Sequence, residues 1–250
     1  MKSIELFSGT GGLALGLYQA GFSHAALFEW DKDSCDNIKY NIANGYPGVR
    51  DWSVFQTDVR TVCYDGYMDK IQLVAGGPPC QPFSLGGKHR AYNDARDMFP
   101  EAVRAVRETR PQAFIFENVK GLLRKSFNSY FSYILLQLQY PEVVKKEDMT
   151  WEEHLALLKR YHTSSHVDDL SYGALPQMLP NHSDALWGNI GLYIRLMYRK
   201  IYLFMILTIM KARKYLTLFA QRLQCCQRFT VMSSFFTIMT VFQRERFPIN

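Results

Sequence analysis

The sequence predicts an α/β protein in which a mostly parallel sheet carries helices on both faces. Short apolar segments alternate with segments whose apolar residues recur at helical spacing, the pattern of strand–helix–strand units. A glycine-rich loop follows the first apolar segment, and an acidic residue follows the second. Ligands of open α/β sheets bind where such loops lie, at the carboxyl ends of the strands. We therefore expect a ligand site along that edge.

The amino-terminal elements begin with a strand over residues 3–7. Leu13 and Leu17 share one face of the helix that follows, and Gly21 suits the position just after a helix end. Residues 24–28 predict the second strand. Together these segments form one strand–helix–strand unit.

The first loop has the spacing of a cofactor-binding turn. Gly9, Gly11 and Ala14 fit the dinucleotide fingerprint, and Glu29 follows Gly9 at the distance typical of a ribose-binding acid. Trp30 offers an indole face on which an adenine can stack. These residues by themselves allow either NAD or S-adenosylmethionine, because both cofactors carry an adenosine ribose.

A third strand is predicted over residues 53–57, after a helix with Cys35, Ile38 and Ile42 on its apolar face. Asp58 follows this strand. Its carboxylate suits the adenine amino group, or else it caps the turn that comes next. Both interpretations remain open from the sequence.

Residues 76–84, Gly-Gly-Pro-Pro-Cys-Gln-Pro-Phe-Ser, follow a short buried strand. The two glycines permit close backbone approach and the two prolines stiffen the loop, so Cys80 is held rigidly past a strand end. Most free cysteines are simply small buried hydrophobic residues. A rigid mount favours a nucleophile instead, because a misplaced attacking atom loses rate steeply.

The next segments continue the alternation. Residues 85–94 predict a mobile loop able to close over a bound nucleotide. A helix over 97–109 and a strand over 112–116 follow. Glu117 at that strand's end is either a surface acid or an acid that faces the same crevice as Cys80. Further helices are predicted over 126–140 and after a capping box formed by Thr150 and Glu153. The pair His162 and His166 has metal-compatible spacing, but no third ligand is near, so we expect no metal.

Four segments in order resemble the DNA cytosine-5 methyltransferases of bacterial restriction-modification systems: residues 7–12, Glu29 with Trp30, residues 78–81 and residues 116–119. The resemblance covers about residues 1–172. It implies a Rossmann-like, S-adenosylmethionine-dependent methyltransferase fold, with a helical insert over 120–170. It also implies double-stranded DNA as substrate, a cognate restriction endonuclease as genetic partner only, and a cytoplasmic location.

The same resemblance assigns residues to roles. Cys80 attacks C6 of a flipped cytosine, and Glu117 stabilises the ring while C5 takes the methyl group. The implied cofactor residues are Phe7, Gly9, Gly11, Gly12, Glu29, Trp30, Asp58 and Pro78, and the implied base or DNA contacts are Gln81, Ser84, Lys88, Arg90 and Asn118. The alternative is an NAD-dependent oxidoreductase with a structural cysteine, but the segments around Cys80 and Glu117 have no role in hydride transfer.

The last part of the chain differs in composition. The whole chain has a net charge of +6 and five cysteines at 35, 63, 80, 225 and 226, an odd number without framework spacing, which suggests free thiols in a reducing cytoplasm. Residues 173–250 contain ten Lys or Arg but only two acids. The apolar run over 202–210 is too short for a bilayer, which needs about 20 residues. We expect neither a membrane anchor nor a native domain there.

The family's later Gln-x-Arg-x-Arg motif is not found where expected, and the segment at 243–246 is one residue off that pattern. A shifted reading frame or a truncated gene accounts for this and for the change in composition. The sequence thus predicts an incomplete sheet without its final strands, and a chain that is inactive or nearly so on its own.

Overall fold

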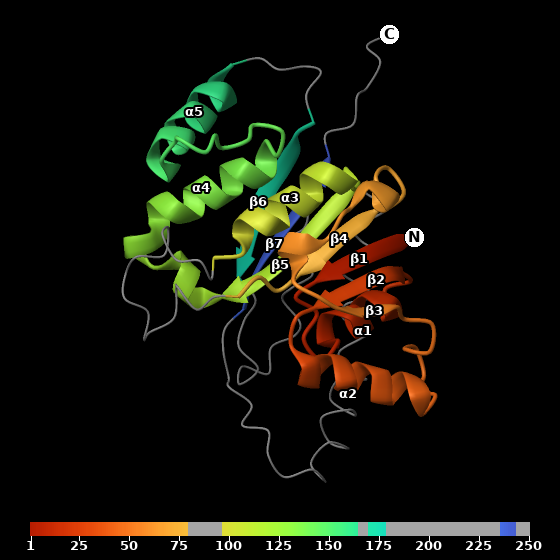
Figure 1. Cartoon of the computed structure of the whole chain (residues 1–250). Coiled ribbons are helices and arrows are strands. Elements are labelled where there is room, and N and C mark those ends of the chain that lie inside the picture. The colour runs from red at the N-terminus through yellow and green to blue at the C-terminus, as the bar shows by residue number, and fades with distance from the viewer. Residues whose placement is uncertain (80–96, 165–169, 179–235, 244–250) are drawn as a thin grey trace, which may run out of the picture.

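The computed structural model describes residues 1–79, 97–164, 170–178 and 236–243 (Figure 1). It forms one seven-stranded sheet in the order β3-β2-β1-β4-β5-β7-β6. The strands are β1 (Lys2–Leu6), β2 (Ser23–Glu29), β3 (Val54–Gln56), β4 (Leu73–Gly76), β5 (Ala113–Val119), β6 (Tyr172–Met178) and β7 (Phe236–Gln243). Strands β1 to β5 pair in parallel, and β7 runs antiparallel to both β5 and β6. The predicted α/β fold with a mostly parallel sheet is confirmed.

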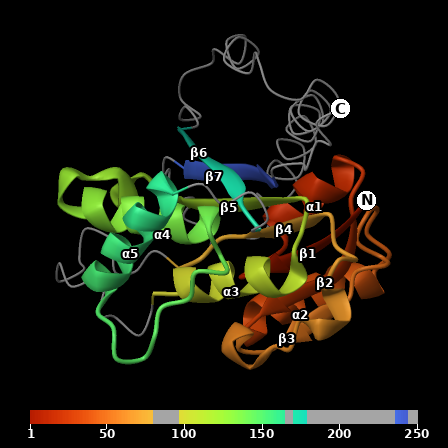
Figure 2. The ribbon, with the colours of Figure 1, turned by 90° about the horizontal axis from the view of Figure 1, so that it is seen from above.

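Helices cover both faces of the sheet. They are α1 (Gly12–Gln19), α2 (Lys32–Ala43), α3 (Phe99–Thr109), α4 (Asn128–Gln139) and α5 (Trp151–Thr163). Leu17 of α1 packs with Leu73 and Ile115 on one face, whereas α3 and α4 pack with Val74 and Phe114 on the other. Figures 1 and 2 show α3, α4 and α5 together on one side of the sheet.

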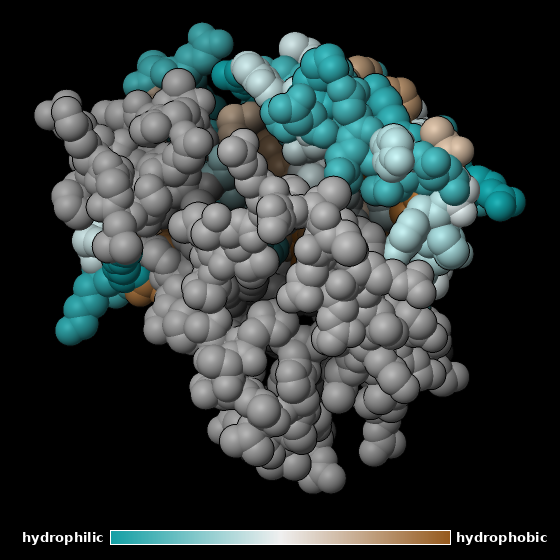
Figure 3. Space-filling view, turned by 90° about the horizontal axis from the view of Figure 1, so that it is seen from below, coloured by the Kyte–Doolittle hydropathy of each residue, from teal (hydrophilic) through white to brown (hydrophobic). Residues whose placement is uncertain are grey.

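Strands β4 and β5 are apolar on both faces because helices cover both. Ile4 and Leu6 of β1 are fully buried in the larger core cluster, together with Phe114 and Phe116 of β5. Full burial of such side chains stabilises the fold by roughly 1.5–3 kcal/mol each. On the outer face seen in Figure 3, the described residues are mostly hydrophilic.

The ends of the helices follow the local sequence signals. Thr150 accepts a hydrogen bond from the Glu153 amide at 3.2 Å, and the Glu153 carboxylate accepts one from the Thr150 amide at 2.7 Å. This confirms the predicted capping box at the start of α5. Helix α3 begins at Phe99 rather than at Asp97, because the Asp97 carboxylate accepts from the Phe99 amide at 3.1 Å and lies before the helix.

The prediction that the sheet lacks its final strands is wrong. Strand β7 lies between β5 and β6, so that Ala113 pairs with Phe242 and Tyr172 pairs with Gln243. The expected boundary after residue 172 therefore falls inside β6. Residues 179–235 and 244–250 lie outside the described ranges, so the non-native character of residues 173–250 stays a prediction. Across the residues that the structure describes, no helix has the length and apolar character needed to cross a membrane.

Candidate active site

The glycine loop turns sharply between β1 and α1. Gly9 and Gly11 have φ angles of 52° and 87°, and Phe7, without the freedom of glycine, has a φ of 55°. A non-glycine residue in this region carries strain that the surrounding structure must hold, and such positions cluster at ligand sites. A Cβ placed on Gly9 or Gly12 would meet no atom within 4 Å. Open space therefore lies beside the loop, as a bound ligand requires.

Glu29 fixes the glycine loop at the end of β2. Its Oε2 accepts a hydrogen bond from the Gly9 amide at 2.7 Å, and its Oε1 accepts one from the Asp31 amide at 2.8 Å. Each carboxylate oxygen can accept a second hydrogen bond, so both remain suited to ribose hydroxyls. Trp30 is 67% exposed beside it and presents its indole to solvent. The arrangement fits the adenosine part of a nucleotide cofactor.

Asp58 caps the short 3-10 turn at Val59–Thr61. Its carboxylate accepts from the Arg60 amide at 3.0 Å and forms an ion pair with the Arg60 guanidinium. The hydrogen bond from that guanidinium lowers the pKa of Asp58. The capping interpretation is therefore confirmed, and a contact of Asp58 with adenine stays a prediction.

The ends of β4 and β5 are joined by side chains of β5. The Asn118 side-chain amide donates a hydrogen bond to the Pro78 carbonyl oxygen at 2.9 Å. A Cβ on Gly77 would lie 3.2 Å from the Glu117 carboxylate, so only a residue as small as glycine leaves that carboxylate undisturbed. Burial raises the pKa of Glu117 to about 7. The structure thus brings Glu117 against the loop that leads to Cys80.

Asn118 has a structural role that the sequence prediction did not include. It is only 2% exposed, and its amide donates to Pro78, so it holds the loop. The sequence could not reveal this, because strand alternation does not show which neighbour an inward amide meets. Its contact with the base or the DNA stays a prediction. Cys80, Gln81, Ser84, Lys88 and Arg90 lie outside the described residues, and their roles stay predictions.

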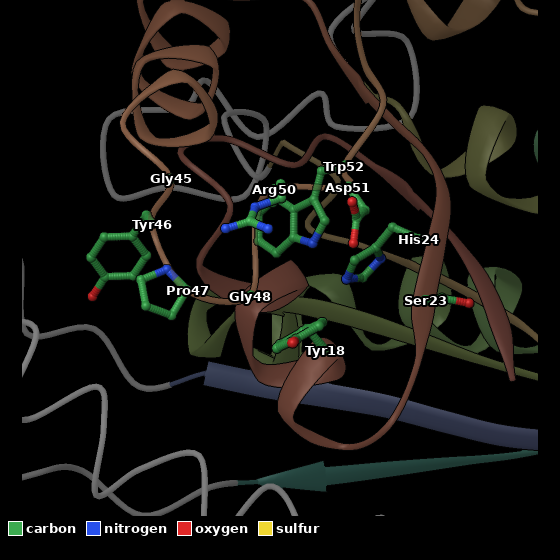
Figure 4. Close-up of a pocket in the computed structure, with 10 residues that line it drawn as sticks. All are labelled: Tyr18, Ser23, His24, Gly45, Tyr46, Pro47, Gly48, Arg50, Asp51 and Trp52. Carbon is green, nitrogen blue, oxygen red and sulfur yellow. The ribbon is translucent and has the colours of Figure 1, made fainter.

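A cavity of about 250 Å³ lies at the opposite end of β2, whose first residue Ser23 lines it (Figure 4). Its other lining residues include Tyr18, Tyr46 and Trp52. Because it lies at the amino end of the strand, it is separate from the edge that carries Glu29 and Glu117. Sequence reasoning did not identify it.

His162, in the last turn of α5, is one half of the predicted histidine pair. His162 accepts a hydrogen bond at Nδ1 from the Tyr140 hydroxyl at 2.7 Å when the other ring nitrogen carries the proton. His166 lies outside the described residues. No group of three or more His, Cys, Asp or Glu side chains in the described part of the chain is arranged to hold a metal ion.

Comparison with known proteins decides the family. The family model for C-5 cytosine-specific DNA methylases matches residues 1–140. The chain belongs to this family. S-adenosylmethionine is the cofactor that this membership supports, in agreement with the sequence prediction, and the NAD alternative receives no support.

The curated relatives that the chain matches are type II methyltransferases. M.NgoMIV of Neisseria gonorrhoeae is 46% identical over 135 residues, which are 54% of this chain and 41% of that protein. M.PspPI of a Psychrobacter strain is 40% identical over 137 residues, covering 54% of this chain and 31% of the relative. M.AquIA of a Picosynechococcus strain is 36% identical over 148 residues, covering 56% of this chain and 57% of that protein.

The chain therefore spans about one third to somewhat more than half of the length of these relatives. Among solved structures, Spodoptera frugiperda DNMT2 matches with a TM-score of 0.40 and 22% identity, over 55% of this chain and 41% of that one. The description of the fold rests on the chain's own sheet order and helices.

Proposed function

We propose that this protein transfers a methyl group from S-adenosylmethionine to C5 of cytosine in double-stranded DNA. One observation carries the proposal: Asn118 and Glu117 of β5 meet the Gly77-Pro78 segment of the cysteine loop at the carboxyl edge of the sheet. A carboxylic acid placed against such a loop has no role in hydride transfer.

The described residues fit the cofactor. Glu29 and Trp30 would hold the adenosine part, and the open space at Gly9 and Gly12 would admit the methionine part. When bound, S-adenosylmethionine supplies an electrophilic methyl group on a sulfonium. The chain's own task is to orient that group towards the base and to keep water away from it.

Cys80 and Glu117 would carry the chemistry on the base. The Cys80 thiolate attacks C6 of a cytosine flipped out of the duplex, which makes C5 nucleophilic. Glu117, with its pKa raised to about 7 by burial, is part protonated near neutral pH and can share a proton with N3 of the ring. After methylation C5 loses its proton and the C6–sulfur bond breaks.

The remaining assignments complete the proposal. Gln81, Ser84, Lys88 and Arg90, on the loop that contains Cys80, would contact the base and the DNA backbone. A cognate restriction endonuclease would be the genetic partner, and both proteins would work in the cytoplasm. We further propose that residues from about 173 onward are not a native methyltransferase segment and that the chain alone is inactive or nearly so.

Calorimetry tests the cofactor directly. The purified chain should bind S-adenosylhomocysteine and not NADH, and Glu29→Ala should weaken that binding. Preferential binding of NADH would exclude the methyltransferase function.

Covalent trapping tests the reaction. A form completed with the carboxyl-terminal part of the Neisseria relative should form an adduct with DNA that contains 5-fluorocytosine, and its Cys80→Ser variant should not. An adduct formed equally by both would remove Cys80 from the mechanism. Sequence-specific methylation by the 250-residue chain alone would refute its predicted inactivity.

A further inference from the structure

The cavity at the amino end of β2 has no part in the proposed mechanism (Figure 4). Its walls come from α1, the start of β2 and the loop between α2 and β3. Its volume of about 250 Å³ lies just below the range of about 300–1,000 Å³ that is usual for drug-sized ligands. The cavity therefore suits a smaller molecule, such as a single heterocyclic ring.

Trp52 brings an unused hydrogen-bond donor to this cavity. The residue is only 8% exposed, and its indole nitrogen finds no acceptor among the described residues. Cζ3, on the far side of the indole, lies 2.9 Å from where a Cβ on Gly11 would be. The nitrogen lies on the other side of the ring system, and Figure 4 shows it facing the space between Tyr18 and His24. Because a buried N–H without a partner is costly, a ligand that supplies an acceptor here removes that cost.

The neighbouring polar side chains of β2 already have partners. His24 Nε2 bonds to the Ala14 carbonyl oxygen at 2.8 Å, and its Nδ1 bonds to the Ser3 hydroxyl at 3.0 Å. The Ser23 hydroxyl donates to the carbonyl oxygen of Met1 at 3.4 Å. Of the buried groups on this wall, the indole N–H is therefore the one that a ligand can engage.

The loop that forms the opposite wall is held in shape without a ligand. The Trp52 amide donates to the Val49 carbonyl oxygen at 3.1 Å. Gly48 has a φ of 89°, and a Cβ on it would lie 2.5 Å from the Tyr18 ring. Glycine thus lets the loop lie directly against that ring. A wall that is already formed lowers the ordering cost of binding.

The lining favours a planar ring that carries carbonyl groups. Tyr18 and Tyr46 supply aromatic walls against which such a ring can pack. Trp52 offers a donor inside the cavity, while the exposed Arg50 and Asp51 place a donor and an acceptor next to each other. A cyclic imide has two carbonyl oxygens with an N–H between them, so it complements these groups. Uracil is a ring of this kind.

We propose that this cavity is a second ligand site, which binds a small planar heterocycle of the cyclic imide type through the Trp52 N–H and the tyrosine walls. The inference goes beyond the proposed function and does not depend on it. The cavity contains Ser23, the first residue of β2, whereas Glu29 and Glu117 lie towards the carboxyl ends of their strands.

Titration of the ¹⁵N-labelled chain with uracil tests the site through the indole N–H signals. The signal that Trp52→Phe removes should shift and saturate in the millimolar range, as expected for so small a ligand. Calorimetry should show that Trp52→Phe binds uracil about 3–10-fold more weakly, because one hydrogen bond is lost. Trp30→Phe is the matched control, since Trp30 is exposed outside the cavity and its replacement should leave the affinity unchanged.

Tyr18→Ala gives a second test that leaves the core intact, because Tyr18 is partly exposed on α1. Loss of this aromatic wall should weaken uracil binding about tenfold. Tyr40→Ala, an exposed tyrosine of α2 outside the cavity, should not. The inference is overturned if the wild-type chain binds no uracil up to its solubility limit. It is also overturned if Glu117→Gln abolishes binding while Trp52→Phe and Tyr18→Ala retain it, because uracil would then lie at the carboxyl edge.

Discussion

Replacing Asn118 by Ala should loosen the junction between β5 and the cysteine loop. The variant loses the 2.9 Å hydrogen bond to the Pro78 carbonyl oxygen and leaves that buried acceptor unpaired. An unpaired buried acceptor costs about 1–3 kcal/mol, so we expect the unfolding free energy to fall by that amount. Asn118→Asp should cost at least as much, because a carboxylate oxygen would then face a carbonyl oxygen.

Urea unfolding followed by tryptophan fluorescence measures this loss. Asn128→Ala is the matched control, because Asn128 is exposed at the start of α4 and should change stability by less than about 0.5 kcal/mol. Equal midpoints for Asn118→Ala and the wild-type chain would refute the structural role of this amide. In a completed, active form, the same variant should also lose methylation rate, since Cys80 would be held less rigidly.

Three further predictions follow from close contacts and charges. Gly76→Ala would place a Cβ 2.5 Å from the Leu6 carbonyl oxygen and should lower the unfolding free energy by about 1–3 kcal/mol. Gly66→Ala is the control, because Gly66 has open space around it and the change should leave stability unaltered. Equal urea midpoints for Gly76→Ala and the wild-type chain would contradict the close packing of β1 and β4. Glu29→Ala should weaken S-adenosylhomocysteine binding by about 1.5–3 kcal/mol in calorimetry, through loss of charged hydrogen bonds; unchanged affinity would remove Glu29 from the site. Burial raises the pKa of Glu5 from its ordinary 4.5 to about 8, so the stability due to its neutral form is fully present below pH 4.5 and is lost as pH rises through about 8. The unfolding free energy should therefore fall over that window by at most about 5 kcal/mol. Glu5→Gln should flatten this pH profile, and identical profiles for both proteins would contradict the prediction.

Local patterns predicted the individual elements well. The strand expected over 3–7 is Lys2–Leu6, and the helix expected over 126–140 is Asn128–Gln139. Apolar periodicity and caps are encoded within a few residues of each element, so they can be read without the tertiary structure. The carboxyl edge of the sheet was predicted to carry the ligand site for the same reason, since Glu29 and Glu117 each lie at the carboxyl end of a recognisable strand.

Features that depend on distant partners were not predictable. Glu5 reads as an ordinary polar residue in a strand, and only the sheet and α1 together bury it. The hydrogen bond from Asn118 to Pro78 joins residues 40 positions apart in sequence, so no local pattern reveals it. Strand β5 also continues through Val119, beyond the expected end, because β7 pairs with it there.

The insertion of β7 between β5 and β6 has a consequence for synthesis on the ribosome. The first five strands can assemble as soon as residues up to Val119 have emerged, since each pairs with a strand made earlier. Strand β6 must then wait, because its neighbour β7 is translated only when Phe236 to Gln243 appear. During that interval the edge of β5 exposes unpaired backbone groups that another nascent chain can capture. Slower translation between residues 178 and 236 should therefore increase aggregation, and a chaperone that covers an open sheet edge should reduce it.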